Sequence, residues 1–102
     1  MSNSKKSESF NSAGKFVMQN SDCVLVHGLV NSFDLAEMPY AWVRRGNKVY
    51  DVEHDKWYTE GDWSSGAVEK NTYSYSEVLK LVDFTSHLGP WTSKEYEEAM
   101  SG

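Results

Sequence analysis

The sequence predicts an α+β domain: a small antiparallel β-sheet, over about residues 15–54, with one or two C-terminal helices packed on one face. Three observations lead to this class. The first half contains runs rich in β-branched and aromatic residues, a Gly-Asn pair typical of a tight turn separates two of them, and helix-capping signals begin only after residue 73. A chain of 102 residues suits one domain.

The N-terminal segment, residues 1–12, is rich in Ser, Asn and Lys and poor in apolar side chains. Such a segment cannot bury enough surface to offset the entropy that it loses on ordering. We therefore expect a disordered tail over residues 1–12, a short strand over residues 14–18, and a single folded domain over residues 13–102.

The clearest strand is DCVLVHGLV, residues 22–30, which has β-branched residues in series and few helix formers. Alternation along an extended strand places Cys23 and His27 on one face and valines on the other. Both faces are largely apolar, which indicates a central strand. Residues 31–39 are then expected to form a surface loop that ends at a proline.

Residues 40–54 predict a β-hairpin around Gly46-Asn47, because both turn residues tolerate a positive φ angle. A two-residue turn pairs Arg45 with Lys48 and so sets the register of the other pairs. One face then carries core-like residues: Ala41, Val43, Tyr50 and Val52. The opposite face is expected to point outward and carries Tyr40, Trp42, Asp51 and Glu53.

Residues 55–73 show no sustained period and contain two glycines, so we expect a long connection anchored by Trp57, Tyr58 and Trp63. At Ser74 an S-x-x-E capping box opens a helix, which the apolar spacing extends to Leu88 before a Gly-Pro pair ends it. A second capping signal, at Thr92, opens a short terminal helix.

The composition excludes several classes of partner. The net charge is −5 and the excess of carboxylates lies in the second half of the chain, whereas nucleic-acid binding needs clustered Lys and Arg. The longest apolar runs are far too short to span a bilayer. A single cysteine, Cys23, allows no internal disulfide and favours a reducing compartment. We therefore expect a cytoplasmic protein whose acidic face keeps it in solution or, as the alternative, meets a basic protein surface.

Carboxylates are concentrated between residues 51 and 62, at Asp51, Glu53, Asp55, Glu60 and Asp62. Alternation along a strand puts three of them on one side, a geometry that suits a divalent cation or a partner of opposite charge. The sequence has no EF-hand spacing and no Gly-rich phosphate loop. We expect solvated edge charges here, with no metal and no cofactor.

Cys23 is the candidate nucleophile of the chain, but a thiolate at neutral pH needs a nearby base or a positive potential. Cys23 begins a strand, and His27, four residues further on the same face, lies roughly 13 Å away at strand rise. We therefore expect a buried thiol. His27, followed by Gly28, is either a ligand-binding histidine beside a close approach of the backbone or a core histidine bonded to a carbonyl.

Several short motifs follow one another along the chain: CVLVHG from Cys23, YAWV from Tyr40, VYD ending at Asp51, an aromatic pair before a helix, and GPW. Together they resemble a group of small phage and bacterial proteins with the pattern C-x-L-V-H-G, H-A-W-V-E, V-Y-D and G-P-W. The H-A-W and V-Y-D pieces are similar to the His and Asp strands of papain-like and transglutaminase-like cysteine enzymes. The resemblance covers about residues 22–92 and implies, as one alternative, a hydrolase or transferase that uses Cys23 and Asp51.

The hairpin register places position 40 diagonally across from Asp51, where a histidine would be oriented as a catalytic base. This sequence has Tyr40 there, and Arg44 replaces the glutamate of the pattern. A tyrosine, with an ordinary pKa of about 10, cannot replace imidazole as a general base at neutral pH. The resemblance therefore implies a retained scaffold with a binding role.

A second resemblance concerns VLVHG, which is similar to the first strand of ADP-ribosyltransferases, where a His-Gly pair contacts NAD; it implies a minimal transferase that uses His27. The function that we expect is that of a small phage-type accessory protein, which binds a host protein and inhibits or redirects it without catalysis. Aromatic anchors dominate interface energies, so its contact surface is expected to comprise Tyr40, Trp42, Asp51, Glu53, Trp57, Tyr58 and Trp63.

Overall fold

The computed structural model describes residues 4–31 and 37–101. These residues form four helices and five strands. The helices are α1 (Ser4–Met18), α2 (Glu60–Ser64), α3 (Tyr75–Thr85) and α4 (Ser93–Ser101). The strands are β1 (Val24–Asn31), β2 (Glu37–Arg45), β3 (Lys48–Asp51), β4 (Lys56–Thr59) and β5 (Ala67–Tyr73).

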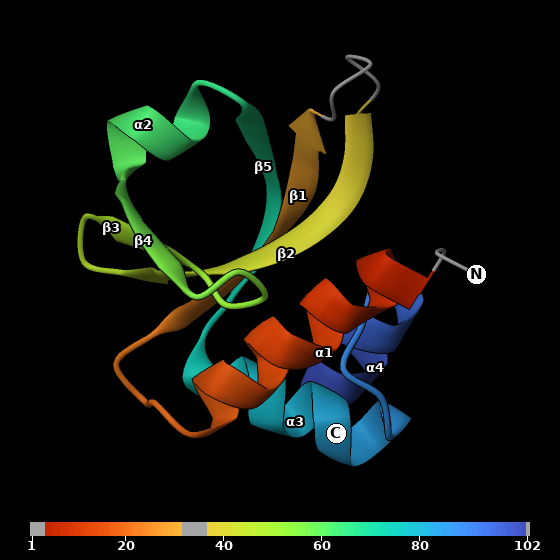
Figure 1. The fold of residues 1–102 in the computed structure, drawn as a ribbon. Coiled ribbons are helices and arrows are strands. Elements are labelled where there is room, and N and C mark those ends of the chain that lie inside the picture. Colours follow the sequence, from red (N-terminus) through yellow and green to blue (C-terminus); the bar gives the residue numbers. More distant parts are fainter. Residues whose placement is uncertain (1–3, 32–36, 102) are drawn as a thin grey trace.

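The strands make one antiparallel sheet in the order β4-β3-β2-β1-β5. The helices α1, α3 and α4 lie on one face of this sheet, and α2 lies over the other face (Figure 1). The predicted α+β class, with C-terminal helices packed on the sheet, is confirmed. The sheet extends beyond residue 54, because the predicted connection 55–73 forms both edge strands, β4 and β5, with α2 between them.

The N-terminal prediction is wrong for the described residues. Residues 4–18 form α1 instead of a disordered tail and a short strand, while residues 1–3 lie outside the described part of the chain. The apolar residues are few, but Phe10, Ala13 and Val17 recur at helical spacing and are all buried against the sheet. One buried face therefore stabilises a helix whose composition is otherwise that of a disordered segment.

The predicted hairpin register is confirmed, since Arg45 pairs with Lys48 and Val43 pairs with Tyr50. Gly46 has a φ angle of 61° while the following residue keeps a negative one, which fits a type II′ turn. At the start of β2 the predicted loop is shorter than expected, because Asn31 already pairs with Glu37. Residues 32–36 of that loop lie outside the described part of the chain.

The sheet is buried on both faces. Under the helices, the core contains Leu25 of β1, Ala41 and Val43 of β2, and apolar residues of α1 and α3. On the other face, Tyr40 and Trp42 are only 5% and 1% exposed. The prediction that this face points outward is wrong, because the segment from β4 through α2 to β5 crosses it and packs aromatic side chains on it.

The C-terminal capping signals are confirmed. Ser74 and Glu77 exchange the two hydrogen bonds of a capping box at the start of α3, and Thr92 and Glu95 do the same before α4. The helix α3 ends at Thr85 rather than at residue 88, because Ser86 adopts a left-handed conformation with a φ angle of 65°. A search of the described residues found no helix of the length and hydropathy needed to cross a membrane.

Candidate functional site

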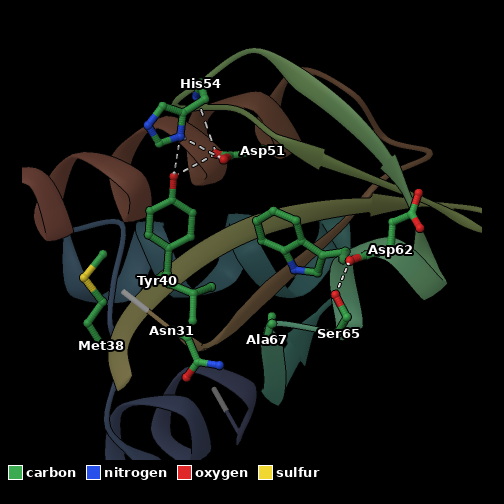
Figure 2. A pocket seen from close by; sticks show the side chains of 11 residues that line it. Asn31, Met38, Tyr40, Asp51, His54, Asp62, Ser65 and Ala67 are labelled. Atoms are coloured by element: carbon green, nitrogen blue, oxygen red, sulfur yellow. Dashed lines mark hydrogen bonds and ion pairs between the residues drawn. The ribbon is translucent and has the colours of Figure 1, made fainter. Parts of the chain in front are cut away.

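A pocket of about 360 Å³ lies between the sheet and α2. Its walls come from the ends of β1 and β2, the turn after β3, α2 and the start of β5. Figure 2 shows Tyr40, Asp51 and His54 meeting at one end, with Asp62 and Ser65 on the opposite side of the view. The apolar part of the wall is formed by Val30, Met38, Trp63 and Ala67.

The carboxylate of Asp51 organises one end of the pocket. The Tyr40 hydroxyl donates a 2.8 Å hydrogen bond to Asp51 Oδ1, and His54 Nδ1 lies 2.8 Å from Asp51 Oδ2 (Figure 2). An ionised carboxylate only accepts hydrogen bonds, so the proton of the second bond resides on His54 Nδ1. In the neutral imidazole, Nε2 is then the nitrogen that can accept a hydrogen bond from a ligand.

Burial fixes the protonation state of Tyr40. Removal of its hydroxyl from water, and next the hydrogen bond to Asp51, raise the pKa of Tyr40 well above its ordinary value. The phenol therefore stays protonated across the physiological range and acts as a donor to Asp51. The structure thus assigns Tyr40 a positioning role, in place of the base that a histidine at this position would supply.

His54 is the site residue that the sequence analysis missed. It follows β3 in a turn closed by a hydrogen bond from the Asp55 amide to the Val52 carbonyl, with a φ angle of 55° at Asp55. This turn brings His54 back over Asp51, three residues earlier in the chain. The three-residue spacing of an acid and a histidine at the end of a strand is only a weak sequence signal, because the contact also needs the left-handed conformation of Asp55.

Trp63 of α2 forms the wall that faces the sheet. Its ring packs against Trp42 at 5.3 Å and against Tyr58 at 4.9 Å between ring centroids. A second pocket of about 420 Å³ shares Trp63 and Ala67 with the first, so the two pockets flank the indole. Among the described residues, the buried Trp63 Nε1 has no hydrogen-bond partner. The indole N–H of Trp63 is therefore an unpaired buried donor beside the two pockets.

The remaining residues of the predicted contact surface are dispersed. Trp57 is 44% exposed on the edge strand β4, where it stacks on Tyr50 at 4.5 Å on the side of the sheet that bears α1. Tyr58 and Glu53 are half-buried. Because Tyr40 and Trp42 are buried, a partner cannot contact them as surface anchors, and the predicted continuous aromatic surface is not formed.

Cys23 lies far from the pocket. Its side chain is 2% exposed in the core under the helices, and burial raises the pKa of the thiol. Along the sheet, Val24, next to Cys23, pairs with Arg44, whereas Tyr40 of the pocket pairs with Gly28. These two pairs are four residues apart, or roughly 13 Å at the rise of a strand. The structure does not bring Cys23 together with Asp51.

His27 is a core residue on the same face as Cys23. Its ring is 6% exposed and contacts Phe10, Tyr73 and Trp91 at centroid distances of 4.7, 4.9 and 5.3 Å. Desolvation lowers the pKa of His27 to about 4, so the imidazole is neutral at physiological pH. Its Nε2 has no hydrogen-bond partner among the described residues.

Within the described residues, no group of three or more His, Cys, Asp and Glu side chains is arranged to hold a metal ion. The relationship indicated by the short motifs stays a prediction. Comparisons of the chain with models of protein families, with curated proteins and with solved structures found no significant match.

Proposed function

We propose that this chain is a small phage-type accessory protein that acts by binding a host protein, which it inhibits or redirects without a catalytic step. The observation that carries the proposal is the pocket between the sheet and α2, whose walls are apolar and whose charged lining residues are acidic. A projecting side chain of a partner protein would fill such a pocket and act as an anchor.

Preorganisation of the pocket supports a binding role. The hydroxyl of Tyr40 and the imidazole of His54 are both held by Asp51, and the Trp63 ring is held between Trp42 and Tyr58. Side chains that are already fixed lose little conformational entropy when a partner binds. The pocket can therefore convert contact area into affinity more efficiently than a mobile surface patch.

Charge supports a basic partner. Asp51 and Asp62 line the pocket, and neither Lys nor Arg is among the lining residues that the structure describes. The whole chain carries a net charge of −5, which favours encounter with a positively charged surface. The exposed Trp57 of the edge strand β4 lies on the opposite side of the sheet from the pocket and would be a separate anchor.

The enzymatic alternatives receive less support from the geometry. Cys23 and His27 lie in the core under the helices, whereas Asp51 lies on the other face of the sheet. A cysteine hydrolase needs its thiolate within hydrogen-bond reach of the base. A transferase that uses His27 needs that ring to be accessible, and it is buried among three aromatic residues.

A capture experiment with matched variants tests the proposal. Asn31 and Asn71 are both exposed strand residues, but only Asn31 lines the pocket. Immobilised wild-type protein should retain a stoichiometric partner from a bacterial lysate, Asn31→Trp should lose it because the indole occupies the pocket, and Asn71→Trp should keep it. Equal capture by both variants, with unfolding curves showing that both are folded, would contradict a role for the pocket.

A further inference from the structure

We infer that the pocket accepts a primary ammonium group on an apolar stem, namely a lysine side chain of the partner protein. That this lysine belongs to a host protein rests on the proposed function. The preference of the pocket for an ammonium group does not. Hydrogen-bonding capacity, charge and wall composition each point to the same group.

The polar groups of the pocket are mainly acceptors. His54 uses Nδ1 as a donor to Asp51, which leaves the Nε2 lone pair, and the Ser65 hydroxyl donates its hydrogen to the Asp62 carbonyl at 2.9 Å, which leaves its oxygen. Asn31 also lines the pocket and has an amide oxygen that can accept a further hydrogen bond. An ammonium group has three donors and no acceptor, and is therefore complementary to this set.

The arrangement of these acceptors favours an ammonium over a guanidinium group. Asn31 ends β1, His54 follows β3, and Asp62 and Ser65 belong to α2 and the residue after it. A planar guanidinium group matches best a single carboxylate in a two-pronged contact. The three N–H donors of an ammonium group sit on a single nitrogen at the end of a flexible stem, so they can turn towards acceptors that come from separate elements.

The charge of the pocket excludes an anionic ligand. Asp51 is 5% exposed and Asp62 is exposed at the rim, so a cation gains from both carboxylates as it enters. The aromatic residues Tyr40 and Trp63 line the same space. A carboxylate or phosphate in this position would instead be repelled.

The apolar walls account for the stem. Val30, Met38 and Ala67 line the pocket, whose volume of about 360 Å³ lies at the lower end of the range for small-ligand sites. A lysine side chain places four methylene groups against such walls and keeps its charge at the polar end.

Titration with small probes tests this inference directly. We expect Nα-acetyl-lysine-N-methylamide to shift the Trp63 indole N–H signal in NMR spectra, and to bind at least about tenfold more tightly than its Nε-acetylated form, which has lost the charge. Equal binding of both forms would overturn the role of the ammonium group. Tighter binding of the arginine analogue, or of 1,5-diaminopentane, would overturn the assignment to a lysine side chain in favour of a guanidinium group or a free amine.

Two neighbouring carboxylates provide the matched variants. Glu60 and Asp62 both lie in the first turn of α2. Glu60 lines the second pocket, whereas Asp62 lines the first pocket and a further one bounded by Lys48 and Lys56. We expect Asp62→Asn to weaken binding of the lysine probe about tenfold and Glu60→Gln to change it less than about twofold. An equal loss in both variants would show that a general acidic field, rather than this pocket, attracts the probe.

The outcomes separate this inference from the proposed function. If the lysine probe does not bind while a host protein is still captured through the pocket, the inference fails and the proposed function stands. If the probe binds as expected and no partner protein is captured, the proposed function fails and the ammonium site remains. If the probe does not bind and no partner protein is captured, both the inference and the proposed function fail.

Discussion

The hydroxyl of Tyr40 donates a 2.8 Å hydrogen bond to Asp51, and both side chains are 5% exposed. This bond joins β2 to the end of β3 at one end of the pocket. Because burial keeps the Tyr40 hydroxyl protonated, it always donates a hydrogen bond to Asp51 Oδ1. The second oxygen of Asp51, Oδ2, then bonds to His54 Nδ1. Tyr40 and Asp51 therefore fix the position of His54 at this end of the pocket.

Removal of the Tyr40 hydroxyl should destabilise the fold. In Tyr40→Phe the buried carboxylate of Asp51 loses a donor, so we expect the free energy of unfolding to fall by about 1–3 kcal/mol, measured by urea denaturation. Tyr50→Phe is the matched control, because its hydroxyl also donates to an aspartate, Asp55, but at the surface. A loss in Tyr50→Phe as large as that in Tyr40→Phe would show that burial of the bond is not decisive.

Acid should destabilise the protein through His27. The ordinary histidine pKa of about 6.5 applies to the unfolded chain, whereas burial lowers the pKa of His27 to about 4 in the folded state. Between these values the unfolded chain binds more protons, so stability is full above about pH 6.5 and falls as the pH drops towards 4, by roughly 3 kcal/mol. Urea unfolding at closely spaced pH values measures this slope.

The non-titrating variant His27→Asn should flatten that slope between pH 6.5 and 4.5. Below this window the carboxyl of Glu77 contributes too, since the hydrogen bond from Tyr96 lowers the pKa of Glu77 and its stabilising effect disappears as it protonates. An unchanged slope in His27→Asn would assign the upper part of the acid sensitivity to other groups.

Gly28 should not tolerate a side chain. A Cβ atom there would lie 2.2 Å from the Val68 carbonyl oxygen and 2.6 Å from a ring carbon of Trp42, so we expect Gly28→Ala to cost about 3 kcal/mol or more in thermal or urea unfolding. Gly61→Ala in α2 meets nothing within 4 Å and should be neutral or slightly stabilising. Similar stability of the two variants would contradict the close approach of β5 to β1.

The thiol of Cys23 should be unreactive in the folded protein. Its 2% exposure and its raised pKa both suppress thiolate formation, so labelling with a thiol reagent should occur only after unfolding. The double variant Cys23→Ala, Ser21→Cys moves the thiol to an exposed position nearby and should be labelled rapidly. Rapid labelling of native wild-type Cys23 would revive the enzymatic alternative.

Local signals in the sequence predicted the local structure. The Gly-Asn turn fixed the hairpin register, so Val43 and Tyr50 pair as expected, and the S-x-x-E spacing located the start of α3 at Tyr75. These features depend on residues close together in the chain. Turn geometry and capping are settled within a few residues, which is why sequence patterns report them well.

Features that depend on distant residues were not predicted. The helix α1 is stabilised by Phe10, Ala13 and Val17 packing on the sheet, and composition alone does not register such a sparse apolar face. The burial of Trp42 likewise depends on α2, which brings Trp63 onto it from 21 residues further along the chain. The contact of His54 with Asp51 required a turn with a positive φ angle at a non-glycine residue, which sequence patterns rarely indicate.

The most direct test is to follow the indole N–H signals of the protein by NMR while the captured partner is added. We expect the Trp63 signal to shift or broaden at stoichiometric partner, because its Nε1 lies at the pocket without a partner in the described part of the chain. The Trp91 signal should stay in place, because that Nε1 is bonded to Thr85 and His87 on the helix side. A shift of Trp91 with Trp63 unchanged would contradict binding at the pocket.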